Sequence, residues 1–283
     1  MPAREAPTIR QQRLGIELRK LRERAGLSAT DAGAMLGIGQ SRVSNIELGR
    51  IGVSPERVQA FARAYRCGDS KLVAELASMA GERGRHWWDE YRDLLPSALI
   101  DLAELEYHAS ALRSAQVSHL PGLLQTVDYA RLTFQQDIPS LAPPEVEHRV
   151  SHRIKRQTVL YAGNPTPYTA VIHEAALRMQ FGGREQAKAQ LRHILEMSER
   201  PLVTVVVIPF VAGIFPGAGQ SVVYAEGPVP QLDTVQLDSE HGSLFLHSDA
   251  QLDRYREFMK RFEAVALNAE ASRDLILAIS NTL

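Results

Sequence analysis

The spacing of apolar residues predicts short helices along the first 80 positions. Between Arg10 and Ala25, the residues Leu14, Leu18 and Leu21 recur at intervals of four and three, which is typical of a helix with one buried face. The same period, with capping residues at the boundaries, predicts four more helices, at 28–36, 40–48, 54–65 and 70–80. We therefore expect an all-α domain of five helices over 1–80.

Residues 81–96 interrupt this pattern and predict a linker with an aromatic hinge. Gly81 and Gly84 break the helical period, and both tryptophans of the chain, Trp87 and Trp88, follow at once. Their large apolar area predicts that they join the two domains or begin the second core. A ligand cage is the less favoured alternative.

Beyond the linker, residues 97–283 alternate between helical and strand periods, which predicts an α+β domain. Helices are expected at 97–115, after 126, and at 143–160, 174–180, 184–198, 251–267 and 271–279. Strands are expected at 168–172, 203–208, 220–225, 234–237 and 243–246. We expect a sheet of about five strands flanked by helices, with the β-branched run 203–208 at its centre.

The predicted helix 143–160 is dense in charge. Acidic and basic residues are interspersed, which favours a solvated face with paired charges over a second DNA contact. His148 and His152 have the spacing that can hold a metal, but no third ligand lies near them in sequence, and we predict no metal site.

The segment LSATDAGAMLGIGQSRVSNIELG at 27–49 has the pattern of a helix-turn-helix, in which the second helix enters the DNA major groove. Ser28 can cap the first helix, and Gly37 can end it in a left-handed conformation. Val43 and Ile46 would face inward. The polar positions around them are candidate DNA-binding residues: Thr30, Gln40, Ser41, Arg42, Ser44, Asn45 and Arg50.

This segment resembles the Xre/Cro family of repressors, whose pattern it matches almost throughout. The departures are Gly33, where alanine is usual, and Asp31, where glutamate is common. The resemblance implies an ion pair between Arg22 and Glu47 that links the first helix to the end of the recognition helix. We interpret that pair as structural.

Charge is distributed unevenly between the two predicted domains. The net charge of the chain is −1, but residues 1–66 hold 12 basic and 6 acidic residues, a net +6, and the rest hold 20 and 27, a net −7. A positive first domain fits phosphate contact by one end of the molecule. Cys67 is alone, and neither an apolar spanning segment nor a signal peptide is evident, so we expect a cytoplasmic protein, nucleoid-associated when bound to DNA.

Three further segments carry a second resemblance: LPGLLQTVDYAR at 120–131, HRVSHRIKRQTVL at 148–160, and the stretch 172–210. They are similar to the uncharacterised C-terminal domain of a large set of actinomycete Xre-type regulators that are described as antitoxin-like. Leu120 and Val127 depart from the residues common there, and Trp87 with Trp88 fits. The resemblance implies transcriptional regulation and a small partner protein encoded next door.

The sequence offers little support for an enzyme. The glycine-rich stretch 213–219 lacks the following Lys-Ser/Thr of a phosphate loop and leads into a predicted strand. No Gly-x-Ser-x-Gly or His-Glu-x-x-His motif occurs. We therefore expect no catalytic residues, no cofactor and no metal.

Three hypotheses follow for function. The first is a sequence-specific regulator that binds double-stranded DNA as a homodimer on a near-palindromic operator. The second is an antitoxin-like module that holds a small protein, with DNA binding mainly autoregulatory, and the third is a regulator gated by a small molecule. Candidate residues for a ligand or partner pocket are Trp87, Trp88, Tyr91, Leu123, Gln125 and Phe215.

Overall fold

The computed structural model describes residues 7–82, 84–217, 219–239 and 242–283. The chain divides into two compact units between Asp89 and Glu90, a division that falls inside the segment predicted as a linker. None of the described helices is both long and apolar enough to cross a membrane.

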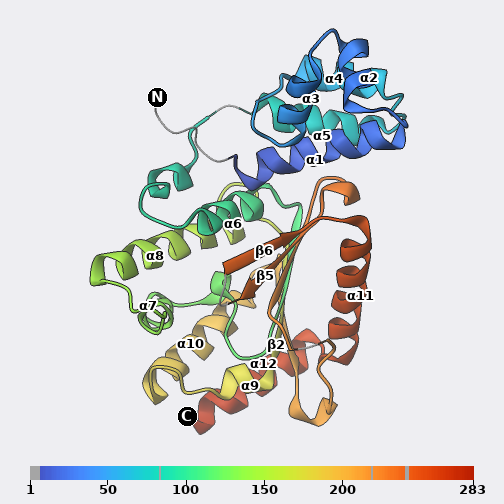
Figure 1. The fold of residues 1–283 in the computed structure, drawn as a ribbon. Helices are drawn as coiled ribbons and strands as arrows, with labels where there is room; N and C mark the ends of the chain where they lie inside the picture. Colours follow the sequence, from blue (N-terminus) through green and yellow to red (C-terminus); the bar gives the residue numbers. More distant parts are fainter. Residues whose placement is uncertain (1–6, 83, 218, 240–241) are drawn as a thin grey trace. The chain divides into compact units, whose positions relative to one another are not determined.

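The first unit contains the five α-helices that the sequence predicts (Figure 1). They are α1 Ile9–Arg24, α2 Ala29–Leu36, α3 Gln40–Glu47, α4 Pro55–Ala64 and α5 Ser70–Gly81. Local signals set their ends. The Ser28 hydroxyl accepts from the backbone N–H of Asp31, and Gly37 ends α2 with φ of 64°.

The second unit is built on a mixed sheet of six strands in the order β3-β2-β1-β4-β5-β6. The strands are β1 Ala111–Gln116, β2 Tyr168–His173, β3 Val203–Ile208, β4 Val222–Glu226, β5 Thr234–Ser239 and β6 Gly242–Leu246. β1, β2 and β3 run parallel, and β4, β5 and β6 join them through antiparallel pairs. The α+β prediction is therefore confirmed, with six strands in place of about five.

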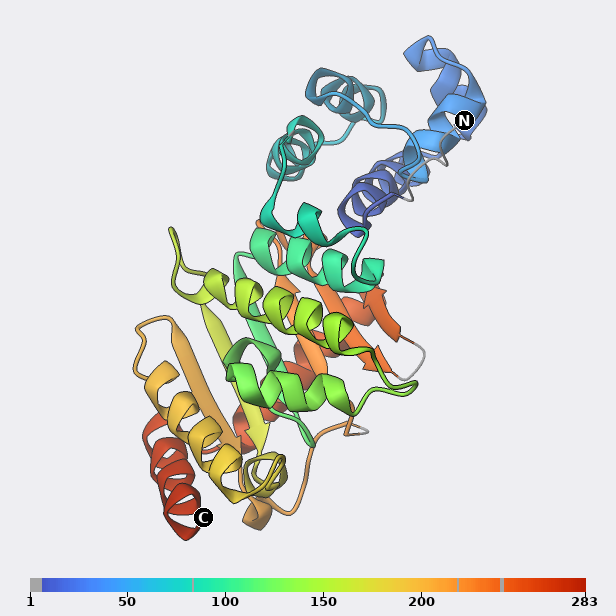
Figure 2. The ribbon, with the colours of Figure 1, turned by 90° about the vertical axis from the view of Figure 1, so that its left-hand side faces the viewer.

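Helices cover both faces of this sheet. The helices are α6 Ser97–His108, α7 Val127–Gln135, α8 Pro143–Arg156, α9 Glu174–Arg178, α10 Arg184–Met197, α11 Asp249–Val265 and α12 Ala269–Thr282. One apolar core joins Leu112 and Val205 on one face to α10 and α12. The opposite face, with Ala115 and Val171, packs on α11. Figure 2 views the sheet from the side that α6, α7 and α8 cover.

Two local predictions are wrong. The expected helix 97–115 ends at His108, and its last residues form β1, the strand that pairs with both β2 and β4. The run Val203–Ile208 is an edge strand rather than a central one. Its outer edge is covered in another way: Val207 donates to the Ser272 hydroxyl at 2.9 Å and accepts from the backbone N–H of Leu267 at 2.8 Å.

Candidate DNA interface

The recognition helix of the first unit is α3. Val43 and Ile46 are buried and fix its inner face. Three polar residues at its start, Gln40, Ser41 and Arg42, are exposed, so this turn presents hydrogen-bonding groups to solvent. A helix end of this kind is the part of a helix-turn-helix that reaches base edges.

The turn before α3 depends on close backbone packing. A Cβ atom on Gly33 would lie 2.7 Å from the carbonyl oxygen of Ile38, too close for any side chain without a shift of the backbone. Ile38 in turn donates its N–H to the carbonyl of Gly33 at 2.9 Å. Glycine at this position therefore allows α2 to approach the turn that aims α3.

Helix α1 braces the other end of α3. Arg22 donates to Glu47 through two parallel hydrogen bonds of 2.7 and 2.9 Å, and its third nitrogen donates to the carbonyl of Leu27 at 2.7 Å. The structure thus brings together the two residues that the resemblance pairs. A Cβ on Gly15 would lie 2.5 Å from the carbonyl oxygen of Glu47, so this glycine, which sequence reasoning missed, lets the two helices touch. An isolated glycine inside a helical period was the available signal.

The electrostatics of this brace favour a fixed ion pair. The hydrogen bonds that Arg22 donates to the Glu47 carboxylate raise the pKa of the Arg22 guanidinium above its ordinary value. Burial, together with the nearby Glu47 carboxylate, raises the pKa of the Tyr65 phenol to about 12. Arg22 and Tyr65 therefore each keep one protonation state at neutral pH.

The candidate DNA-binding residues lie together along α3 and the segments beside it. Gln40 donates to the Ser44 hydroxyl at 2.9 Å, and the Asn45 amide donates to the carbonyl of Ser41 at 2.8 Å. These bonds order the two amide side chains on the helix surface. Thr30 at the start of α2 and Arg50 after α3 are also exposed. Their contacts with bases or phosphates stay predictions.

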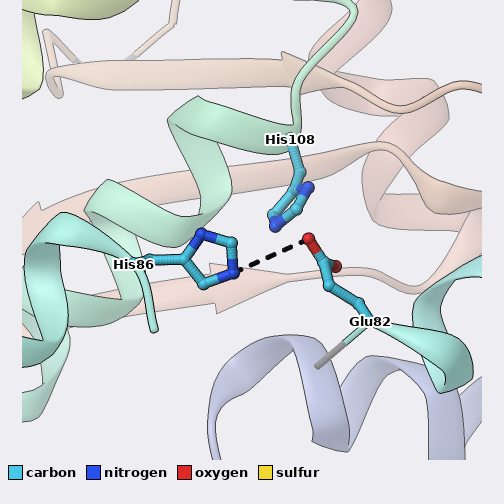
Figure 3. A group of neighbouring side chains, drawn as sticks. All are labelled: Glu82, His86 and His108. Atoms are coloured by element: carbon cyan, nitrogen blue, oxygen red, sulfur yellow. Dashed lines mark ion pairs between the residues drawn. The ribbon is translucent and has the colours of Figure 1, made fainter. Parts of the chain in front are cut away.

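The aromatic hinge of the sequence analysis begins in the first unit. Trp88 is buried, and its ring stacks on the His86 imidazole with centroids 4.4 Å apart, while Trp87 meets Trp88 edge-on. His86 Nε2 also lies 3.7 Å from a carboxylate oxygen of Glu82 (Figure 3). The third side chain labelled there, His108, ends helix α6 of the second unit. Trp88 is thus a core residue with a filled ring face, which argues against a ligand cage.

The remaining candidate pocket residues do not converge. Tyr91 bonds its hydroxyl to that of Ser151 at 2.8 Å. Leu123 belongs to the core on one face of the sheet, whereas Phe215 packs with α11 on the opposite face. Gln125 is buried and donates to the carbonyl of Leu120. Leu123 and Phe215 therefore do not line one pocket, because they lie on opposite faces of the sheet. A ligand or partner site at the other candidate residues stays a prediction.

Helix α8 corrects the expectation of a solvated charged face. Arg156 makes two hydrogen bonds of 2.6 and 2.7 Å to Glu106, and both side chains are buried. Arg153 donates to Gln125 at 2.5 Å, and its guanidinium lies 4.4 Å from the centroid of the Phe134 ring. Burial, with the charge of Arg156, lowers the pKa of Arg153 to about 9. His152, buried among these cations, has its pKa lowered to about 3.

Comparison with protein-family models assigns each unit. Residues 13–76 match a helix-turn-helix domain, so the first unit defines the protein as one of the helix-turn-helix class, which indicates a DNA-binding regulator. Residues 99–278 match a domain of unknown function, DUF5753. This match covers more than half of the chain, and the protein belongs to the family that this domain defines. No curated protein and no solved structure matches the chain. The narrower Xre/Cro and antitoxin-like resemblances stay predictions.

Proposed function

We propose that the protein is a sequence-specific transcriptional regulator that binds a near-palindromic operator in double-stranded DNA as a homodimer. The observation that supports this is the exposed polar start of α3, held by the Arg22–Glu47 pair and by backbone contacts at Gly15 and Gly33. A single helix-turn-helix reads few base pairs, so two copies on related half-sites give the specificity that a regulator needs.

Three polar residues of α3 have DNA-contacting roles that follow from their chemistry. Gln40 and Asn45 suit adenine, and Arg42 suits guanine or a phosphate. The bond from Asn45 to Ser41 uses one amide hydrogen and leaves the amide oxygen and the second hydrogen for a base edge. The positive charge of the first 66 residues supplies the phosphate contacts that set the register.

The test begins with selection of binding sites from random duplex DNA by the purified full chain. Fluorescence anisotropy at one fixed salt concentration then compares the selected site with an unrelated duplex. Asn45→Ala is expected to cost about 1–3 kcal/mol at the selected site, roughly a 5- to 150-fold loss of affinity, and to leave the unrelated duplex unchanged.

Arg261→Ala provides a matched control. Arg261 is exposed on α11 of the second unit and pairs with Glu257, so its removal changes the net charge but no residue of the first unit. Equal loss on all sequences for Asn45→Ala, or no selected site at all, contradicts the base-reading role. Genomic occupancy, mapped by crosslinking and sequencing, extends the test to the cell. The discrete occupancy peaks of the parent protein should disappear in a Gln40/Arg42/Asn45 triple alanine variant.

We also propose that the second unit, which carries a net negative charge, regulates the first by binding rather than by catalysis. Its acidity favours a basic partner, which is the charge complementarity expected of a small protein held by this unit. Co-purification with the product of an adjacent short gene, from a cytoplasmic extract, tests this candidate. A small-molecule effector is the alternative.

A further inference from the structure

A hollow of about 370 Å³ lies on the α11 face of the sheet, in the second unit. Its base is apolar: Val222 on β4 and Phe262 on α11 both line it, and each is only 3 % exposed. The volume lies in the range of sites that hold small organic ligands. The hollow therefore has an apolar floor and room for a ring system.

The walls of this hollow are aromatic. Tyr255 and Phe258 meet edge-on with centroids 5.6 Å apart, and Phe258 lies 6.4 Å from Phe262. Gly217, with φ of 79°, closes one side, and even a Cβ there would come within 3.8 Å of the Phe258 ring. A larger residue at 217 would fill the space beside Phe258. This arrangement favours a flat apolar group stacked against aromatic faces.

One cation lines the same hollow. The Arg254 guanidinium lies 5.4 Å from the centroid of the Phe258 ring. Two other arginines of α11 are already neutralised: Arg256 pairs with Asp233 at 2.8 Å, and Arg261 pairs with Glu257 at 3.0 Å. Arg254 forms no ion pair with any carboxylate in the described part of the chain. Its charge is available to an anionic ligand.

We propose that this hollow binds an aromatic carboxylate, with the ring stacked on Phe258 and Phe262 and the carboxylate bound by Arg254. A second hollow on the same face is lined by Arg113, but that guanidinium already contacts Glu226 and Glu263 at 2.9 and 3.5 Å, so it offers no free charge. The proposal goes beyond DNA binding and does not depend on it. A result that contradicts ligand binding in the hollow does not contradict DNA binding by the first unit, and the reverse also holds.

The experiment is isothermal titration calorimetry of the full chain, without DNA, using sodium 2-naphthoate and the neutral isostere 2-naphthamide. Naphthoate is expected to bind one to one with a submillimolar Kd, at least about tenfold more tightly than the amide, because a charge-assisted bond to Arg254 is lost with the carboxylate. Arg254→Gln should weaken naphthoate about tenfold and make the two ligands equal.

Two further variants sharpen the test. Lys260→Gln removes the same charge from an exposed position on α11 that does not line the hollow, and it should leave both ligands unchanged. Phe258→Leu should weaken both ligands while the circular-dichroism melting curve stays close to that of the parent. Absence of saturation by naphthoate up to 5 mM (about −3 kcal/mol of binding free energy), or a preference for naphthoate that survives Arg254→Gln, overturns the proposal.

Discussion

Both units of the molecule bury an arginine–glutamate pair, and the two pairs differ in how they are supported. In the first unit, Arg22 retains a third bond to a backbone carbonyl and lies 10 % exposed. In the second, Arg156 is more deeply buried, and beside it lie the half-buried cation Arg153 and the buried imidazole of His152. The first pair braces a small domain, whereas the second neutralises a charge-rich interior. Loss of the carboxylate should therefore be more costly in the second unit.

The largest expected effect comes from Glu106→Gln. This change removes the carboxylate that pairs with the buried Arg156 guanidinium, and we expect the free energy of unfolding to fall by about 3–5 kcal/mol. Glu47→Gln should cost less, about 2 kcal/mol, because Arg22 keeps its bond to the carbonyl of Leu27. Urea denaturation followed by amide hydrogen exchange measures both and assigns each loss to its unit.

The double variant Glu106→Gln/Arg156→Met is the control for that prediction. Removal of both charges should recover much of the stability, since the remaining cost is packing and not an isolated buried ion. Equal losses for Glu106→Gln and Glu47→Gln, or no recovery in the double variant, would contradict the contrast between the two interiors.

A smaller effect is expected from acid. The pKa of His152 is about 3 in the folded protein, because burial and the charges of Arg156, Arg153 and Lys155 disfavour its protonation, against an ordinary value of 6.5. The unfolded chain therefore binds the proton first, and stability present above pH 6.5 is lost as the pH falls toward 3. Between pH 7 and pH 5 the loss is about 2 kcal/mol.

His152→Gln isolates this contribution. The variant carries no titrating group at the position, so the difference between its unfolding free energies at pH 7 and pH 5 should be smaller than that of the parent by about 2 kcal/mol. The first unit offers the reference: its hydrogen-exchange protection should change little over the same interval, because Arg22 and Tyr65 have pKa values raised above their ordinary ones. An identical acid slope in parent and variant would refute the assignment to His152.

The smallest of the three effects concerns Gly33. Alanine is usual there in the family that the segment resembles, but the Cβ would meet the carbonyl of Ile38 at 2.7 Å. We expect Gly33→Ala to destabilise the first unit by about 1–2 kcal/mol, a net loss after the gain in helix propensity. Gly52→Ala, where nothing lies within 4 Å of the added atom, should stay within about 0.5 kcal/mol of the parent in thermal melts. A stabilised Gly33→Ala variant would show that the turn relaxes freely.

Local signals explain what the sequence could predict. The five helices of the first unit were predictable because their signals come from residues close together in sequence. Examples are the caps at Ser28 and Gly37 and the apolar period of α1. The segment Ala111–Gln116 was not, because Ala, Leu, Arg and Gln favour helix, and only pairing with β2 and β4 makes the segment a strand.

Long-range contacts explain the rest. The β-branched run of β3 indicates burial on both faces, which is usual for a central strand, but Leu267 and Ser272 cover its edge instead of another strand. Likewise, the sequence of α8 alone predicts a solvated charged face. The fold instead pairs Arg156 with Glu106, which lies 50 residues away in sequence. Gln40, Ser41 and Arg42 are exposed on α3, whereas Ser44 and Asn45 are half-buried, and the base contacts of all five residues stay predictions.

The central place of β1 bears on how the second unit is made. During synthesis this strand leaves the ribosome before either neighbour exists, since β2 begins at Tyr168 and β4 at Val222. Until then both of its edges are open to other chains. We expect β1 of the nascent unit to pair with β2 and β4 late and slowly, and to need chaperones until then. Chains whose translation stops before Glu226 should be prone to aggregation.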